Sequence, residues 1–392
     1  MTNPSDAYMN PALAADDQIV FTVAGEPDSD EMRWFADGLR AALERQGHIY
    51  RPGAVITRAD SMADQELPVR LVLNLCAINA PRPIKRRGQG TFVATVFMGQ
   101  DDVPDLMKAA YPLIVKSLSN MIIYNARKDG AMESHFITPE QGHYVVRHTG
   151  DEQLYFEQIY ERVQPLACSH LVINNEFVPD LPEALWGGDI PTQQIGAAGR
   201  TLDSMGLLPA AIPIQEYLNE RELRHVKLLY GIGGLSYGNL SARALHNPEH
   251  FWMSASGVDK SKLETVGRDI LLVTGYDQEK LQIALSVPAN VEPRRVSVDA
   301  IEHFMIYREH PSVGAIVHIH AWWNEPIPST MVNYPCGSYE LAYEVAELVR
   351  QAPDPSRAVI GLKNHGLTIT GHSIAEIFQR IDGHILNQVP MD

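Results

Sequence analysis

The chain has 392 residues, enough for two or three domains, and its 32 basic against 48 acidic residues give a formal net charge of −16. A chain with this negative charge repels nucleic acid and anionic membranes, so neither is expected as a partner. The sequence contains neither an apolar run of about twenty residues nor the basic and apolar start of a secretory signal, and its cysteines (Cys76, Cys168 and Cys336) are too scattered for a disulfide framework. These features predict a soluble, cytoplasmic protein.

The first half of the chain alternates predicted strands with predicted helices. An apolar run at 19–24 leads into an amphipathic helix that begins near Met32 and ends near Gly47. The same patterns predict strands at 69–75, 91–98, 121–124 and 171–174, and helices at 103–117 and 152–162. This alternation predicts an α/β layer domain of unknown role over residues 1–200.

A segment rich in glycine and proline follows, at 180–213, and places the domain boundary near residue 200. Beyond it the pattern predicts a helix at 214–230, strands near 240–243, 251–254 and 270–274, and a helix that Ser297 caps and that runs to about residue 309. The last helix opens with a capping-box spacing from Ser373 to Glu376, and its packing face extends to Leu386.

Two histidines, His318 and His320, lie one residue apart in an apolar stretch at 313–320. Residues two apart on a strand project from the same side, so both imidazoles could bind one metal ion. His365 follows another apolar run at 358–361, and a carboxylate, Asp299, lies upstream. An isolated pair of this kind is more often a pair of strand histidines that hydrogen-bond to the backbone.

The order of motifs around the histidines favours a metal site over backbone-bonded strand histidines. The chain carries in turn the segments YGNLSAR (237–243), SASGVDK (254–260), SVD (297–299), VHIH (317–320), CGSYELA (336–342) and NHG (364–366). In content and order this resembles the class II aldolase/adducin family over residues 205–392. The resemblance implies an antiparallel sheet flanked by helices, preceded here by the separate α/β layer domain, and a homo-oligomer, either dimer or tetramer.

The resemblance also implies that His318, His320 and His365 bind a divalent metal ion. Three imidazoles with one open position suit catalytic zinc, with Mn²⁺, Fe²⁺ and Co²⁺ as alternatives. Asp299 matches a family position that ligates the metal or moves a proton. In the other interpretation Asp299 only favours the helix N-terminus or pairs with His303.

An anion pocket is predicted from Asn239, Ser256, Gly257 and Ser297, which resemble the phosphate-binding loops of the family. Plain β-turns are the alternative for the Gly-Asn and Ser-Gly pairs. Lys260 is either an electrostatic aid to that pocket or, as the sequence favours, a solvated surface lysine. Val298 stands where the sugar-phosphate enzymes of the family have a second hydroxyl residue, so one phosphate donor is missing. The anionic group of the substrate is therefore either a phosphate or a smaller group such as a carboxylate.

The proton donor is the least determined part of the predicted site. Only 15 residues separate the histidine pair from Cys336, and Glu325 is the one carboxylate in that segment, while Tyr334 and Tyr339 are the nearest phenols. Glu325 and Tyr339 are therefore the candidates beside Asp299. The first domain offers a basic turn at 85–90 and the histidines His135, His143 and His148, for which a solvated turn and ordinary surface positions are the simpler interpretation.

The function that the resemblance implies is a metal-dependent lyase of the aldolase type. Its substrate is a small anionic hydroxy-ketone, a sugar phosphate or a hydroxy-keto acid, and the metal acts as a Lewis acid on an enediolate. A sugar-phosphate 4-epimerase, a dehydratase or a decarboxylase would use the same scaffold. A non-catalytic, adducin-like binding module is the alternative from another class.

Overall fold

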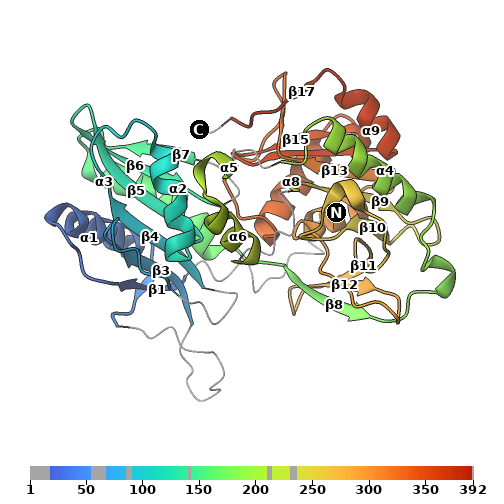
Figure 1. The fold of residues 1–392 in the computed structure, drawn as a ribbon, viewed down its shortest axis with the longest axis horizontal. Helices are drawn as coiled ribbons and strands as arrows, with labels where there is room; N and C mark the ends of the chain where they lie inside the picture. Colours follow the sequence, from blue (N-terminus) through green and yellow to red (C-terminus); the bar gives the residue numbers. More distant parts are fainter. Residues whose placement is uncertain are drawn as a thin grey trace, which may run out of the picture. The chain divides into compact units, whose positions relative to one another are not determined.

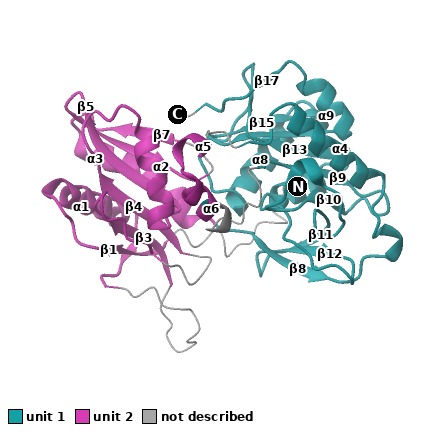
Figure 2. Ribbon diagram, in the orientation of Figure 1, with its two compact units in different colours: residues 1–14, 170–213, 226–390 teal, residues 15–169, 214–225, 391–392 magenta. Residues whose placement is uncertain are grey.

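The computed structural model of the protein (Figure 1) describes residues 18–53, 68–84, 91–139, 143–209, 214–229 and 236–390. The chain forms two compact units, coloured separately in Figure 2. The amino-terminal unit contains residues 15–169 and 214–225, and the carboxy-terminal unit contains residues 170–213 and 226–390. No helix within these ranges has both the length and the apolar composition that a membrane span requires.

The amino-terminal unit is built on a mixed seven-stranded sheet in the order β2-β1-β3-β4-β5-β6-β7. The first five strands in this order are parallel, and β6 and β7 add an antiparallel edge. The strands are β1 (Val20–Ala24), β2 (Ile49–Tyr50), β3 (Val69–Leu75), β4 (Phe92–Met98), β5 (Met121–Lys128), β6 (Ala131–Ile137) and β7 (His143–Arg147). The α/β layer prediction is confirmed, although the sequence patterns did not predict β2, β6 and β7, and the strand predicted at 171–174 is not part of this sheet.

Helices α1 (Asp30–Arg45), α2 (Leu106–Ser117) and α3 (Glu152–Cys168) accompany this sheet, as the periodicity predicts. α1 begins where the Ser29 hydroxyl accepts a hydrogen bond from the Met32 N–H, and it buries Phe35, Leu39 and Leu43. Phe35 packs against Phe156 of α3 with ring centroids 5.8 Å apart. The predicted helix at 214–230 is two helices, α5 (Ile214–Tyr217) and α6 (Glu220–Leu229).

The carboxy-terminal unit is built on an eight-stranded sheet in the order β15-β16-β13-β9-β10-β11-β12-β8. All neighbours are antiparallel except β12 and β8. The strands are β8 (Asn174–Val178), β9 (Asn239–Arg243), β10 (Phe251–Ser254), β11 (Ile270–Asp277), β12 (Gln282–Ser286), β13 (Ala315–Ile319), β15 (Val359–Leu362) and β16 (Gly366–Gly371). The helices are α4 (Ile190–Ser204), α7 (Ala300–Glu309), α8 (Tyr339–Gln351) and α9 (Ile374–Ile381). This is the expected antiparallel sheet with flanking helices.

The glycine- and proline-rich stretch before residue 213 contains a packed helix. Asp189 and Thr192 form a capping box at the start of α4, and Pro191 lies in its first turn, where a missing N–H has no cost. α4 buries Ile195 and Leu202, and a side chain at Gly199 would collide with the Lys260 carbonyl. Because β8 and α4 pack in the carboxy-terminal unit, that unit begins at residue 170, and the chain returns to the amino-terminal unit at 214–225.

Two predicted helix ends differ in the structure. α7 begins at Ala300 with Asp299 as its N-cap residue, and the Ser297 hydroxyl does not cap it. α9 ends at Ile381, so the expected packing position Leu386 lies in a short strand, β17 (Ile385–Leu386), that pairs with β14 (Trp322–Trp323).

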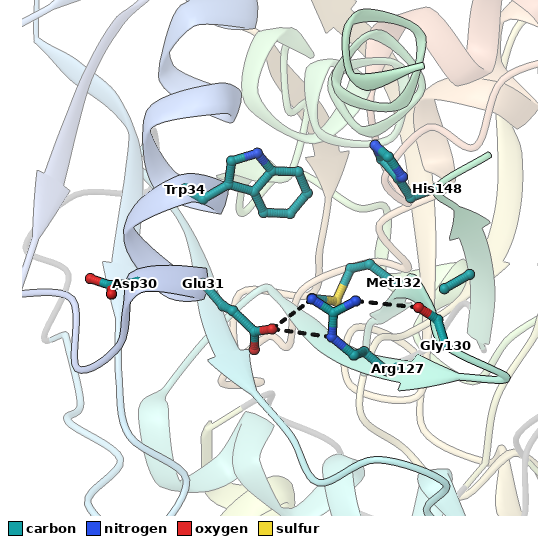
Figure 3. A pocket seen from close by; sticks show the side chains of 8 residues that line it. Asp30, Glu31, Trp34, Arg127, Gly130, Met132 and His148 are labelled. Atoms are coloured by element: carbon teal, nitrogen blue, oxygen red, sulfur yellow. Dashed lines mark hydrogen bonds and ion pairs between the residues drawn. The ribbon is translucent and has the colours of Figure 1, made fainter. Parts of the chain in front are cut away.

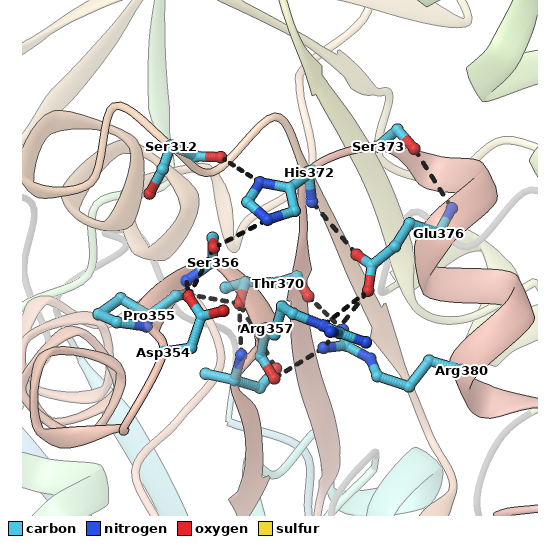
Figure 4. Close-up of polar contacts among 11 residues, drawn as sticks. Ser312, Asp354, Pro355, Ser356, Arg357, Thr370, His372, Ser373, Glu376 and Arg380 are labelled. Atoms are coloured by element: carbon cyan, nitrogen blue, oxygen red, sulfur yellow. Dashed lines mark hydrogen bonds and ion pairs between the residues drawn. The ribbon is translucent and has the colours of Figure 1, made fainter.

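Polar contacts fix the start of α9 beside β16 (Figure 4). The Ser373 hydroxyl accepts from the Glu376 N–H as predicted, whereas the Glu376 carboxylate accepts from the N–H of His372 at 3.2 Å. Arg380 donates to the carbonyls of Arg357 and Thr370. These contacts hold the outer end of β16, at the opposite end of the strand from His365.

Candidate metal centre

The three predicted metal-binding histidines come from neighbouring strands of the carboxy-terminal sheet. His318 lies on β13, His320 follows its last residue, and His365 lies in the turn between β15 and β16. β16 pairs with β13 in a register that sets Thr368 opposite His318 and Leu367 opposite Ile319. This register brings the β15–β16 turn to the end of β13, so residues about 45 positions apart in the chain become neighbours.

The imidazole rings converge and are buried. Their centroids lie 5.2 Å (His318–His320), 4.8 Å (His318–His365) and 4.7 Å (His320–His365) apart. One ring nitrogen from each lies within 4.8 Å of the others, and no side chain of the three is more than 8% exposed. Among the described residues, this is the one His, Cys, Asp and Glu cluster with that geometry.

The protonation state of His318 follows from its hydrogen bond. Its Nδ1 lies 3.1 Å from the carbonyl of Leu367, and because a carbonyl only accepts, Nδ1 carries the proton. Nε2 therefore presents a lone pair, and that atom has no hydrogen-bond partner in the described part of the chain. A metal-ligating histidine usually binds the metal through one ring nitrogen while the other donates a hydrogen bond that orients the ring.

Burial keeps all three rings neutral. It lowers the pKa of His318 to about 4 and that of His365 to about 3, where the nearby His318 adds to the effect. The pKa of His320 is lowered well below its ordinary value, by burial first and then by the two other rings. Neutral imidazoles with converging lone pairs are the donor form of histidine, so the cluster fits a divalent metal ion.

Asp299 lies next to this cluster but outside the group of nitrogens. Its Oδ2 accepts a hydrogen bond of 2.7 Å from the side-chain amide of Asn239, and its Oδ1 has no partner among the described residues. Burial raises the pKa of Asp299, although His365 and Asn239 lower it in part. Its carboxylate makes no capping bond on α7, and His303 instead contacts the Ser241 hydroxyl at 2.7 Å.

A second buried carboxyl, Glu302, lies one turn further along α7, and the sequence reasoning missed it. Its Oε1 accepts from the Thr368 hydroxyl at 2.5 Å. Burial, and then the neighbouring Asp299, raise the pKa of Glu302 to about 8, so this carboxyl carries a proton at neutral pH. The signal was present in the sequence, because Asp299 and Glu302 are three residues apart on one helix face.

The residues of the predicted anion pocket occupy separate positions. Asn239 and Ser297 are buried, and Asn239 is bonded to Asp299. Ser256 and Gly257 form the turn after β10, where Gly257 has φ +69° and the Ser256 N–H donates to the carbonyl of Arg295 at 2.8 Å. Their role toward an anion stays a prediction.

Lys260 is buried, so the interpretation as a solvated surface lysine is wrong. It is only 4% exposed, and its Nζ donates to the carbonyl of Ser236 at 2.9 Å. The short 3-10 helix that contains it, η3 (Lys260–Lys262), packs against α4, an element that the sequence did not predict. Its positive charge helps to lower the pKa values of His318 and His320.

The two other candidate proton donors are Glu325 and Tyr339. Glu325 is exposed. Tyr339 is the first residue of α8, its N–H donates to the carbonyl of His170, and burial raises its pKa to about 12.

Two other residues lie beside the cluster instead. The ring of Tyr237 is 5.4 Å from that of His320, and the Sγ of Cys336 lies 3.4 Å from Nε2 of His365. Tyr237 is the first residue of the motif YGNLSAR, and Cys336 is the first residue of CGSYELA. The sequence alone assigned neither residue to the site.

Among the described residues of the amino-terminal unit, the histidines form no comparable centre. His135 and His143 stack, with Nδ1 of His135 3.0 Å from Nε2 of His143. His148 lines a separate cavity of about 340 Å³ with Trp34 and Arg127, where Arg127 is paired with Glu31 (Figure 3). The basic turn at 85–90 lies outside the described residues.

Comparisons with known proteins address the carboxy-terminal part. The sequence model of the Class II Aldolase and Adducin N-terminal domain matches residues 223–383. A methylthioribulose-1-phosphate dehydratase from Bacillus cytotoxicus is 36% identical over 90 residues, which are 23% of this chain and 37% of that enzyme. The match thus spans little more than a third of the curated relative.

Solved structures give low overall similarity. YgbL from Klebsiella pneumoniae, described as a putative aldolase/epimerase/decarboxylase, aligns with TM-score 0.32 at 18% identity over 49% of this chain and 83% of that one. An L-fuculose 1-phosphate aldolase aligns with TM-score 0.33 at 18% identity over 49% and 79%. No family model matches the amino-terminal half. Residues 223–383, which contain the three converging histidines, are similar to the class II aldolase and adducin family.

Proposed function

We propose that the carboxy-terminal unit is a metal-dependent lyase of the aldolase type that acts on a small anionic hydroxy-ketone. The observation that carries this proposal is the convergence of three neutral, buried imidazoles, with one nitrogen of each within 4.8 Å of the others. A binding module without chemistry has no need of three converging imidazoles, because one hydrogen bond can use only two of the three converging nitrogens.

His318, His320 and His365 would hold the ion, and zinc is the first choice because three imidazoles with one open position are typical of catalytic zinc. Such an ion supplies Lewis acidity toward the carbonyl and hydroxyl oxygens of a substrate. The chain's own part is to keep the three rings unprotonated by burial and to fix the His318 tautomer through Leu367.

Asp299 and Glu302 are the proposed proton carriers. They are buried one helical turn apart, and both have raised pKa values, so the pair holds a proton at neutral pH close to His365. Asn239 fixes the orientation of the Asp299 carboxyl through its amide. Lys260 adds a fixed positive charge, which favours a substrate with an anionic group such as a phosphate or a carboxylate.

Dehydration is the second candidate, and one observation favours it: the 36% identity over 90 residues to a methylthioribulose-1-phosphate dehydratase. Aldol cleavage would remove a hydroxyl proton, break the C–C bond and return a proton to the resulting carbanion, whereas dehydration would remove a C–H proton next to the carbonyl and give a proton to the departing hydroxyl. Each reaction needs one proton removed and one delivered, so the same proton carriers would serve either. We further propose a small-molecule substrate, a homo-oligomeric assembly and a cytoplasmic location.

Product analysis of the zinc-loaded protein tests the proposal and separates the candidates. Ketose phosphates and hydroxy-keto acids are incubated with the protein, and the products are followed by mass spectrometry. Aldol cleavage releases two fragments whose masses sum to the substrate, dehydration gives one product that is lighter by one water, and epimerisation gives an isomer of unchanged mass. Turnover that is equal in the wild type and in His320→Ala would contradict the metal-dependent mechanism.

A further inference from the structure

A thiol lies at the edge of the histidine cluster. The Sγ of Cys336 is 3.4 Å from Nε2 of His365, and the same Nε2 is 3.1 Å from Nε2 of His320. Two atoms that can donate an electron pair to a metal thus lie beside a third, Nε2 of His365.

These separations match those of ligands around one tetrahedral ion. With metal–nitrogen bonds of about 2.0–2.1 Å and a metal–sulfur bond of about 2.3 Å, a tetrahedral angle sets two nitrogens about 3.4 Å apart and a nitrogen and a sulfur about 3.6 Å apart. The observed values of 3.1 and 3.4 Å lie within a few tenths of an ångström of these.

The turn that carries the thiol is fixed in place. Gly337 has φ +72°, its carbonyl accepts from the N–H of Val172 at 2.8 Å, and its own N–H bonds to the carboxyl of Asp299. A side chain at Gly337 would press on Val298, so this position requires glycine. Cys336 is therefore held next to both Asp299 and His365.

We propose that Cys336 is a fourth, sulfur donor to the metal ion in the substrate-free protein. The sulfur lies outside the group of ligand atoms within 4.8 Å of one another, so ligation requires the Cys336 side chain to move closer to that group. The thiol proton leaves to solvent as the metal–sulfur bond forms, because the thiolate is the ligand. This assignment rests on the proposed metal site. An incoming substrate would replace the thiolate on the metal ion.

Cobalt(II) spectroscopy tests the assignment without reference to activity. Metal-free wild type, Cys336→Ser and Cys168→Ser are each loaded with Co²⁺, and bound metal is counted by elemental analysis. Cys168→Ser is the matched control, because Cys168 is a buried cysteine of α3 in the other unit. The thiolate-to-cobalt charge-transfer band in the near ultraviolet is expected in the wild type and in Cys168→Ser, and it is expected to be absent from Cys336→Ser.

The outcomes separate the two proposals. One equivalent of Co²⁺ without the band in the wild type overturns the sulfur ligand and leaves the three-histidine site standing. Failure of the wild type to bind Co²⁺ overturns the metal site and the sulfur ligand together.

A competition titration against a chromophoric chelator gives a second readout, for which circular dichroism first establishes that each variant is folded. Mutation of a residue that only hydrogen-bonds to a metal ligand typically weakens metal binding ~10–100-fold. Loss of the sulfur, a direct ligand, should weaken Co²⁺ binding by at least that much. Equal affinity in the wild type and Cys336→Ser would overturn the assignment.

Discussion

Nε2 of His320 lies 3.1 Å from Nε2 of His365 in a site where burial lowers the pKa of both rings. At that distance two neutral imidazoles either share one hydrogen bond or face a common cation. The lone pair of His318, oriented by the carbonyl of Leu367, makes a third donor. The cluster can therefore bind a positive ion at its centre, and this relationship underlies the following predictions.

Zinc should stabilise the fold through this cluster. A ligand that binds only the folded state at ~100 times its dissociation constant adds ~2.7 kcal/mol to the free energy of unfolding. We expect a gain of that order in urea unfolding when metal-free wild type receives Zn²⁺. His320→Ala should lose the gain, whereas His246→Ala should retain it, because His246 is exposed on the same unit. An equal gain in the wild type and in His320→Ala would contradict the assigned site.

Acid should destabilise the metal-free protein through its buried histidines, of which His303 is the simplest to isolate. Burial lowers the pKa of His303 to about 3 from an ordinary 6.5. Above pH 6.5 the ring is neutral in both states and contributes no pH dependence. Below pH 6.5 the unfolded chain takes up a proton that the folded chain refuses, so stability falls by up to ~1.4 kcal/mol per pH unit for this ring.

The variant His303→Asn should remove that contribution. Urea unfolding of metal-free protein between pH 7 and pH 4 measures the slope, which should be shallower in the variant by about the amount of one titrating group. Parallel pH profiles for the two proteins would show that His303 is not held neutral.

Glu302 predicts a pH dependence of opposite sign. Burial raises its pKa to about 8 from 4.5, so below pH 4.5 the carboxyl is protonated in both states and has no effect. Between pH 4.5 and pH 8 only the unfolded chain ionises, which lowers the stability of the wild type. The stability difference between Glu302→Gln and wild type should therefore grow in favour of the variant across that range. A difference that is flat with pH would contradict the prediction.

Gly199 tests the packing that buries Lys260. A methyl group at this position would collide with the Lys260 carbonyl, so Gly199→Ala must push η3 away from α4. We expect a loss of ~1–3 kcal/mol in the free energy of unfolding, the usual cost of overpacking. Gly187→Ala is the control, because a side chain there meets no atom within 4 Å and the backbone has no positive φ. Equal losses in both variants would indicate a general glycine effect.

The sequence predicted those parts of the site that depend on local pattern. His318 and His320 were assigned to one strand from their spacing alone, and β13 contains the first and ends just before the second. The motif order suggested His365, whose place depends on a hairpin that pairs back onto β13. The family resemblance supplied that long-range contact, since no local pattern encodes the register of β16 against β13.

The parts that the sequence did not predict depend on packing between distant segments. Lys260 lies in a polar stretch and is buried because α4 covers it. The glycine and proline residues in and around α4 make its sequence pattern atypical of a helix. Glu302 was passed over because its protonated state results from burial against Thr368. Cys336 is a neighbour of His365 because of the path of the turn before α8, which no local pattern encodes.

A zinc titration of metal-free protein by isothermal calorimetry tests the central claim most directly. The account predicts one Zn²⁺ bound per chain in the wild type and none in the variant in which His318, His320 and His365 are all alanine. A wild type that binds no zinc, or a triple variant that binds it with unchanged stoichiometry and affinity, would contradict the account.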